Sequence, residues 1–133
     1  MENSAIERWH EIVKSRGIAS LKALLADDVV FESPVVHTAQ SGKAITFKYL
    51  AAALHVLNND TFQYLNEWLG PHSAVLEFQS SYDGILINGV DMITWNDEGL
   101  ITHFKVMIRP LKAVNKIHEM MGQMLQLEAA QQR

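Results

Sequence analysis

The chain contains 133 residues, which corresponds to a single domain at the usual size of about 100–200 residues. Apolar residues make up 48% of it and charged residues 20%, as in ordinary globular proteins and unlike disordered chains. Its net charge of −4 argues against a nucleic-acid partner, because phosphate binding needs concentrated lysine and arginine. Cysteine is absent, so disulfides, thiolate zinc sites and cysteine nucleophiles are excluded.

No targeting signal is found in the sequence. The first residues lack the apolar core of a signal peptide, and no run approaches the roughly 18 apolar residues that span a bilayer. We therefore expect a cytoplasmic protein without a membrane partner that forms one domain over residues 1–133. The polar residues 128–133 are expected to form a frayed tail.

Two helices are predicted at the start of the chain. Ser4 followed by Glu7 is a capping box, in which each side chain can bond the free backbone N–H of the other residue. Gly17 is expected to end this first helix. A second, short helix should follow it. The apolar side chains at helical spacing are Ile6, Trp9, Ile12 and Val13 in the first helix and Leu21, Leu24 and Leu25 in the second.

A strand and a third helix are predicted next. Residues 29–33 are mostly β-branched or aromatic and predict a strand that Pro34 ends. Ser41 is expected to cap the third helix, which the polar residues 58–60 end. The apolar face of this helix is predicted to contain Phe47, Leu50, Ala51, Leu54 and Leu57.

From residue 62 onward the apolar residues recur with a period of two, which indicates an antiparallel meander. Asp83-Gly84 and the segment 96–99 provide its hairpin turns. Gly89 is expected to form a β-bulge, and Pro110 to begin a C-terminal helix at its first turn. Helices gathered at one end of a meandering sheet indicate an α+β fold.

Three segments resemble the nuclear transport factor 2-like superfamily, which includes ketosteroid isomerases and SnoaL-like polyketide cyclases. They are LLADDVVFESP at residues 24–34, NDEGLI at 96–101 and MIRP at 107–110, and with Gly42 the resemblance covers nearly the whole chain. It implies a cystatin-like α+β fold, in which a strongly curved, mostly antiparallel sheet forms a cone around the N-terminal helices, with a C-terminal helix. It also implies an apolar pocket at the mouth of the cone and homodimers that form through the outer sheet face.

The resemblance lets the catalytic positions of ketosteroid isomerases be compared with this chain. Those enzymes use a carboxylate base together with an oxyanion hole made by a Tyr and a protonated Asp. Here Ser33 stands at the position of the base, Trp9 at that of the Tyr and Asp91 at that of the Asp. Because a serine hydroxyl cannot take a proton from carbon as a carboxylate can, steroid isomerisation by that mechanism is not expected.

Asp91 is the predicted catalytic residue. It shares a strand face with Ile87, Ile93 and Trp95, and burial among such neighbours raises the pKa of a carboxyl group. In one interpretation Asp91 is therefore a proton donor or a base near neutrality. In the other it is a structural residue that accepts hydrogen bonds from backbone amides near Gly89.

The remaining site predictions concern the pocket wall. The indole N–H of Trp9 either holds a ligand oxygen or belongs to an ordinary core residue, and Ser33 bonds Trp9, a ligand or the loop at Pro34. His37 lies in the loop where the cone should open. The other predicted lining residues are Val13, Leu25, Phe31, Tyr49, Ile93, Phe104, Val106 and Ile108. The six histidines show no metal-ligand spacing, so we expect neither a metal nor a cofactor.

The C-terminal helix is rich in methionine, whose flexible thioether suits irregular or adaptable surfaces. Its apolar stripe contains Val114, Ile117, Met120, Met121, Met124, Leu125 and Leu127. This stripe covers the sheet edge of its own subunit, closes the pocket as a lid, or contacts a second subunit.

Three functions are compatible with these patterns. The first is acid–base isomerase or cyclase chemistry by Asp91 on a small, largely apolar carbonyl- or polyketide-like compound. The second is binding of such a ligand without catalysis, and the third is a dimeric association module with a vestigial pocket. We expect a SnoaL-like, ligand-binding homodimer, while the identity of the ligand and the presence of catalysis stay open.

Overall fold

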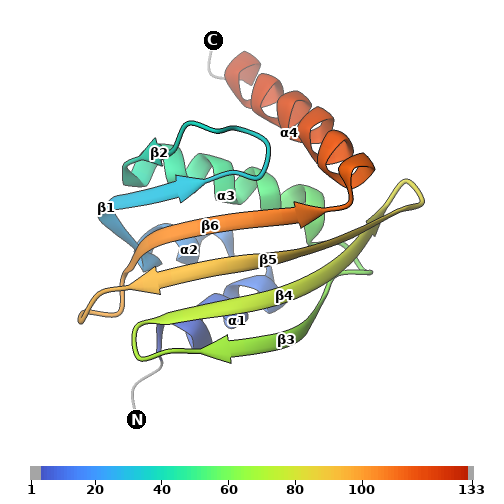
Figure 1. Cartoon of the computed structure of the whole chain (residues 1–133). Coiled ribbons are helices and arrows are strands. Elements are labelled where there is room, and N and C mark those ends of the chain that lie inside the picture. The colour runs from blue at the N-terminus through green and yellow to red at the C-terminus, as the bar shows by residue number, and fades with distance from the viewer. Residues whose placement is uncertain (1–3, 132–133) are drawn as a thin grey trace.

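The computed structural model describes the backbone of residues 4–131 and the side chains of residues 4–124. Its strands form one curved sheet in the order β2-β1-β6-β5-β4-β3. Figure 1 shows α1, α2 and α3 behind one face of this sheet, whose other face is uncovered. The elements are α1 (Ala5–Ser15), α2 (Ile18–Leu24), β1 (Leu25–Glu32), β2 (Gln40–Ser41), α3 (Lys43–Leu57), β3 (Gln63–Leu69), β4 (Ser73–Tyr82), β5 (Ile85–Trp95), β6 (Ile101–Arg109) and α4 (Leu111–Gln131). The predicted α+β fold with a C-terminal helix is confirmed.

The first helix begins with one of the two hydrogen bonds of the predicted capping box, and it ends at Ser15, two residues before the predicted Gly17. The Oγ of Ser4 accepts a hydrogen bond from the backbone N–H of Glu7 at 3.1 Å. At the other end Arg16, and not Gly17, takes the left-handed conformation, with a φ of 59°. Leu25 does not belong to α2, because it pairs with Ile101 of β6 and so begins β1 before residue 29.

The third helix is entered through a glycine rather than capped by a serine. Ser41 lies in β2, where it pairs with Val30 of β1. Gly42 follows with a φ of 110°, a conformation that other residues rarely adopt, and no side chain caps the helix. Asn58 ends α3 as predicted. The buried residues of the helix are Thr46, Leu50, Ala52, Val56 and Leu57, whereas Ala51 is only partly buried.

The meander from β3 to β6 is confirmed, and Asp83 and Gly84 both have the positive φ expected of its tight turn. The predicted bulge at Gly89 is wrong, because Gly89 stays in register between Phe78 and Ile108. A Cβ at Gly89 would lie 2.4 Å from the carbonyl oxygen of Met107 and 2.7 Å from Cζ of Phe78. Close packing of the Phe78 ring and the neighbouring strand therefore accounts for the glycine.

One pairing in the sheet has no local signal in the sequence. Strand β1 lies parallel to β6 in the interior of the sheet, and this register places Phe31 beside Phe104. The pairing closes the curved sheet over the helices. The inner face of the sheet and these helices then share one core of buried apolar side chains.

The C-terminal helix follows Pro110 instead of including it in its first turn. The carbonyl of Pro110 accepts hydrogen bonds from the backbone N–H groups of Ala113 and Val114. The side chains of Leu125 and Leu127 lie outside the described residues, as do residues 132–133, so the frayed tail stays a prediction. Within the described residues, no helix combines the length and the apolar character needed to cross a membrane.

Candidate functional site

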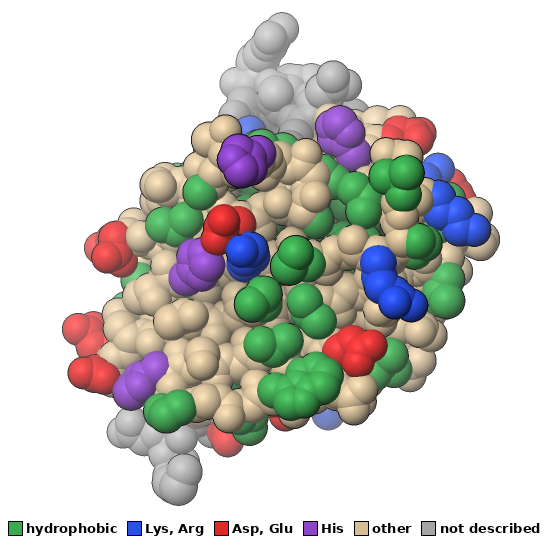
Figure 2. Space-filling model, viewed as in Figure 1, with side chains coloured by type: hydrophobic (Ala, Val, Ile, Leu, Met, Phe, Trp, Pro, Cys, Tyr) green, Lys and Arg blue, Asp and Glu red, His purple; other side chains and the backbone are tan. Residues whose placement is uncertain are grey.

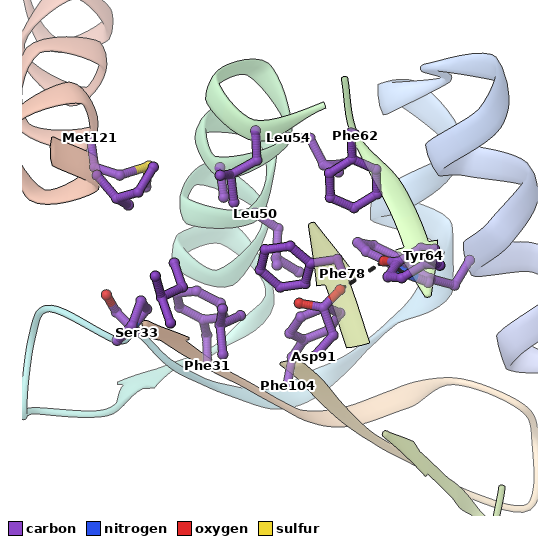
Figure 3. Close-up of a pocket in the computed structure, with 17 residues that line it drawn as sticks. Phe31, Ser33, Leu50, Leu54, Phe62, Tyr64, Phe78, Asp91, Phe104 and Met121 are labelled. Carbon is purple, nitrogen blue, oxygen red and sulfur yellow. Dashed lines mark hydrogen bonds between the residues drawn. The ribbon is translucent and has the colours of Figure 1, made fainter. Parts of the chain in front are cut away.

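An apolar cavity of about 40 Å³ lies between the inner face of the sheet and helices α3 and α4 (Figure 3). Four of its lining side chains carry a nitrogen or oxygen atom: Trp9, Ser33, Tyr64 and Asp91. The rest of the wall is apolar and is formed by Phe31, Pro34, Leu50, Ala53, Leu54, Leu57, Phe62, Phe78, Phe104, Val106, Ile108, Ile117 and Met121. The few polar groups are thus surrounded by a wall that excludes most water.

Most of the predicted site residues line this cavity, namely Trp9, Phe31, Ser33, Asp91, Phe104, Val106 and Ile108. The other five do not. Leu25 and Ile93 are buried in the core and do not line the cavity, and Val13 lines a cleft on the surface. Tyr49 packs its ring against Phe31, with 5.9 Å between centroids, and His37 is exposed in its loop.

A chain of hydrogen bonds joins three elements at one end of the cavity. Nε1–H of Trp9 on α1 donates to the hydroxyl oxygen of Tyr64 on β3 at 2.8 Å. The hydroxyl of Tyr64 in turn donates to Oδ2 of Asp91 on β5 at 2.7 Å. Tyr64 was not among the predicted site residues. In the sequence, only strand alternation could have indicated that Tyr64 faces inward. In the structure it pairs with the inward-facing Phe78.

The structure settles the local contacts of Trp9 and Ser33. Trp9 is a buried core residue whose ring packs edge-on against Phe104, with 4.9 Å between centroids. Its N–H is already bonded to Tyr64 and is not directed at Ser33. The Oγ of Ser33 accepts a hydrogen bond from the backbone N–H of Val35 at 3.1 Å, which is the loop contact that the sequence allowed.

Asp91 is a buried carboxyl group that has little to stabilise its charge. It is 7% exposed, and burial raises its pKa to about 7, while the weaker effect of the Tyr64 hydrogen bond lowers it. No backbone amide of the described residues donates to this carboxyl group, so the backbone contact expected of a structural Asp91 is not found, and Tyr64 is its hydrogen-bond partner. Burial and the charge of Asp91 raise the pKa of Tyr64 well above its ordinary value, so Tyr64 remains a protonated donor.

The second carboxyl oxygen of Asp91, Oδ1, has no hydrogen-bond partner among the described residues, and Figure 3 shows it turned away from Tyr64. Because Asp91 lines the cavity, its protonated form can donate from this side to an acceptor held there. Ser33 lies across the cavity from Asp91. No second carboxylate lines the cavity in the described part of the chain, so a separate carboxylate base is missing.

The histidines do not assemble a metal centre. Between residues 4 and 124, no group of three or more histidine, aspartate or glutamate side chains could hold a metal ion. Three histidines instead pair singly with surface carboxylates: His10 with Glu67, His72 with Asp97, and His103 with Glu32.

The C-terminal helix contributes to the cavity wall in a way that sequence reasoning left open. Ala113, Ile117 and Met121 are buried against the helix's own subunit, where α4 contacts α3, β5 and β6. Ile117 and Met121 also line the cavity. One stripe of α4 therefore both covers its own subunit and forms part of the cavity wall.

No protein-family model matches the chain, and no curated protein matches it. Solved structures, in contrast, resemble it over nearly its whole length. A steroid delta-isomerase from Pseudomonas aeruginosa is 32% identical with a TM-score of 0.90, over 95% of this chain and 92% of that one. An uncharacterised bacterial protein with a cystatin-like fold from Silicibacter pomeroyi is 30% identical with a TM-score of 0.87, over 95% and 88%.

A more distant structure shares the fold. It is a Mycobacterium tuberculosis protein in complex with estradiol-17β-hemisuccinate, 21% identical with a TM-score of 0.62, over 82% of this chain and 93% of that one. The two nearer proteins combine substantial identity with almost complete coverage, which confirms the resemblance found in the sequence. The chain belongs to the nuclear transport factor 2-like superfamily, which includes the ketosteroid-isomerase-like and SnoaL-like proteins.

Proposed function

We propose that the protein binds a small, largely apolar carbonyl compound in the cavity, with protonated Asp91 donating a hydrogen bond to the carbonyl oxygen. The observation that carries this proposal is the state of Asp91: a buried carboxyl with a pKa of about 7 and one oxygen without a protein partner. Apolar burial contributes affinity at about 25 cal/mol for each Å² removed from water. A donor placed among apolar walls then orients the ligand.

A carbonyl group suits this site because it accepts hydrogen bonds and carries no charge. An anionic ligand would meet the negative charge of Asp91 whenever that group ionises. A pure hydrocarbon would leave the buried donor without a partner, which costs about 1–3 kcal/mol. The similarity to a steroid delta-isomerase supports ring-shaped, steroid-like carbonyl compounds as the class to test first.

Acid–base turnover of the bound compound is a second candidate function, favoured by the pKa of Asp91. A group with a pKa near 7 can both give and take a proton at neutral pH. Because Ser33 replaces the carboxylate base, Asp91 itself would give and take the proton in a cofactor-independent isomerisation or cyclisation. Incorporation of deuterium beside the carbonyl of a ketone incubated in D₂O would reveal such exchange, and its loss in Asp91→Ala would assign it.

The binding proposal is tested by the pH dependence of ketone affinity. We expect the dissociation constant of cyclohexanone, measured by NMR titration, to stay constant below about pH 6. It should then rise by about tenfold for each pH unit above 7, because only protonated Asp91 donates. Asp91→Asn should bind independently of pH, since its amide still donates but does not titrate. Asp91→Ala should bind weakly throughout.

Glu77→Gln is the matched control, because Glu77 lies on the opposite face of the sheet and should leave the wild-type profile unchanged. Two results together would contradict the proposal: the wild type binds the ketone equally well at low and high pH, and Asp91→Ala binds it as tightly as the wild type does. The thermal unfolding of each variant shows whether a loss of binding reflects a loss of fold.

We also propose that two copies of the chain pair through the outer sheet face. Apolar side chains lie next to one another there across four strands: Trp68, Val75, Val90, Met92 and Met107. Trp68 is 55% exposed and Met107 is 53% exposed. Figure 2 shows this hydrophobic group in the middle of the uncovered face, with charged side chains around it. A contiguous apolar patch with a polar border is typical of an interaction site.

Sedimentation of the wild type and of Met107→Glu tests this pairing. The wild type should sediment as a dimer and Met107→Glu as a monomer, with the ketone affinity at Asp91 retained. A wild-type protein that is monomeric at every concentration would overturn the pairing. A dimer that binds no ketone would instead favour the association module with a vestigial pocket.

A further inference from the structure

The cavity is small for the ligand class proposed above. Its volume of about 40 Å³ corresponds to three or four water molecules at roughly 10–15 Å³ each. Pockets that bind drug-sized molecules usually measure about 300–1,000 Å³. A ligand with more than a few heavy atoms must therefore displace part of the wall.

Most of the wall is held firmly. Phe78 and Phe104 project from strands that are hydrogen-bonded on both sides, and both side chains are fully buried. Trp9 and Tyr64 are fixed by the hydrogen-bond chain that ends on Asp91. Moving any of these residues would open the main core, which interior packing resists.

The part of the wall formed by α4 reaches the same core through Ile117 and Met121, but the rest of the helix is held in a different way. Figure 1 shows α4 at one end of the sheet, with its C-terminal part projecting past the body of the protein. Among the described residues, α4 makes one ion pair, in which Nζ of Lys116 lies 2.8 Å from Oδ2 of Asp83 at the β4–β5 turn. The same Nζ lies 5.9 Å from the ring centroid of Tyr82. Lys116 thus ties the helix to the hairpin.

The helix is also locally weakened beside the side chain that fills the cavity. Gly122 follows Met121, and a Cβ at Gly122 would meet no atom within 4 Å. Its φ is not positive, so neither conformation nor packing calls for a glycine there. Glycine inside a helix is less favourable than alanine, because it loses more backbone freedom when it is ordered. Met121 itself has a flexible, unbranched side chain that can change rotamer at low cost.

From these observations we propose that Met121 and the surrounding turn of α4 form a movable wall that determines the size of ligand admitted to the cavity. The inference rests on the proposed function and deepens it by naming the residue that selects among carbonyl compounds. A ring ketone larger than the cavity enters by displacing Met121 and the adjacent helix, while the Lys116–Asp83 pair favours the closed position.

The test compares three ketones of increasing size: cyclohexanone, 2-decalone and a four-ring 3-ketosteroid. The affinity of each is measured for the wild type, for Met121→Ala, and for Met120→Ala as the control. Met120 neighbours Met121 on the same helix and does not line the cavity. We expect Met121→Ala to raise the affinity for the two larger ketones by at least about tenfold relative to cyclohexanone, and Met120→Ala to leave these ratios unchanged.

A second pair of variants tests whether the wall moves, without removing a side chain that lines the cavity. Gly122→Ala strengthens the helix and should slow the association of 2-decalone several-fold, whereas Lys116→Gln removes the tie to Asp83 and should accelerate it. Cyclohexanone, the smallest of the three ketones, displaces the wall least, so its association should change less than that of 2-decalone in both variants. These two substitutions keep the inference testable even if Met121→Ala does not fold.

The results separate the inference from the proposed function. Unchanged affinity ratios in Met121→Ala, or equal association rates in Gly122→Ala and Lys116→Gln, overturn the movable wall while Asp91-dependent binding of cyclohexanone stands. If no ketone binds in an Asp91-dependent manner to any of these proteins, the proposed function fails and the inference fails with it.

Discussion

Asp91 and Glu77 lie on neighbouring strands of one sheet, yet their side chains occupy opposite faces and their pKa values shift in opposite directions. Asp91 pairs in register with Leu76, the residue that precedes Glu77. Burial raises the pKa of Asp91 to about 7. Hydrogen bonds from the amides of Asn66 and Asn88 lower the pKa of Glu77.

The comparison shows that strand alternation, and not the type of acid, decides what each carboxyl can do. Glu77 accepts from Nδ2 of Asn66 at 2.8 Å and from Nδ2 of Asn88 at 3.0 Å, so its charge is well stabilised at the surface. Asp91 accepts from Tyr64 and faces an apolar cavity with its other oxygen. Only Asp91 of this pair is therefore available to exchange a proton near neutral pH.

The largest effect is expected in the pH dependence of stability. Because folding raises the pKa of Asp91 from 3.8 to about 7, the folded protein binds more protons than the unfolded chain between these values. The contribution of Asp91 to the free energy of unfolding is thus greatest below about pH 4, falls up to about pH 7 and is constant above it. At about 1.4 kcal/mol for each pH unit, the free energy of unfolding that Asp91 loses between these two pKa values is roughly 4 kcal/mol.

Urea denaturation of the wild type and of Asp91→Asn at several pH values measures this loss. The side-chain amide that replaces the carboxyl group in the variant does not titrate, so the difference between the two proteins isolates Asp91 from the other carboxyl groups. A difference that is constant between about pH 4 and pH 7 would show that Asp91 is not desolvated in the folded protein.

A smaller effect is expected from packing beside Asp91 on the inner face of β5. In Gly89→Ala the new methyl group would meet the backbone of the next strand and the Phe78 ring at distances that real contacts do not reach. We expect the free energy of unfolding to fall by about 1–3 kcal/mol. Gly122→Ala is the control, because the same change in open space within a helix should stabilise by about 0.5–1 kcal/mol. Equal effects at the two glycines would contradict this account of the inner face.

The smallest effect is expected on the outer face. Because the pKa of Glu77 is lowered on folding, its contribution to stability is present above its unfolded pKa and is lost as the pH falls through its folded value. Glu77→Gln should therefore reduce stability slightly at neutral pH and have no effect in strong acid, the opposite trend to Asp91. The same sign of pH dependence for the two carboxyl variants, measured in parallel urea titrations, would contradict this comparison.

Local patterns in the sequence determined much of the fold. The Ser4 cap of α1, the Asp83-Gly84 turn and the inward alternation of Asp91 depend on residues a few positions apart, whose preferences act before any distant contact forms. The same kind of reasoning failed at Ser41 and Gly89. At both positions the outcome depends on a neighbouring strand. Ser41 pairs with β1 and therefore lies in strand β2 instead of capping a helix, and the ring of Phe78 fills the space that a side chain at Gly89 would need.

The site itself was decided by tertiary structure. Trp9, Tyr64 and Asp91 come from three elements that meet only because β3 and β5 flank β4 and α1 packs on their inner face. Periodicity predicts which side chains face inward, but it does not tell whether an inward-facing side chain packs in the core or lines the cavity. For that reason Leu25 and Ile93 proved to be core residues, while Ile117 and Met121 of a distant helix line the cavity.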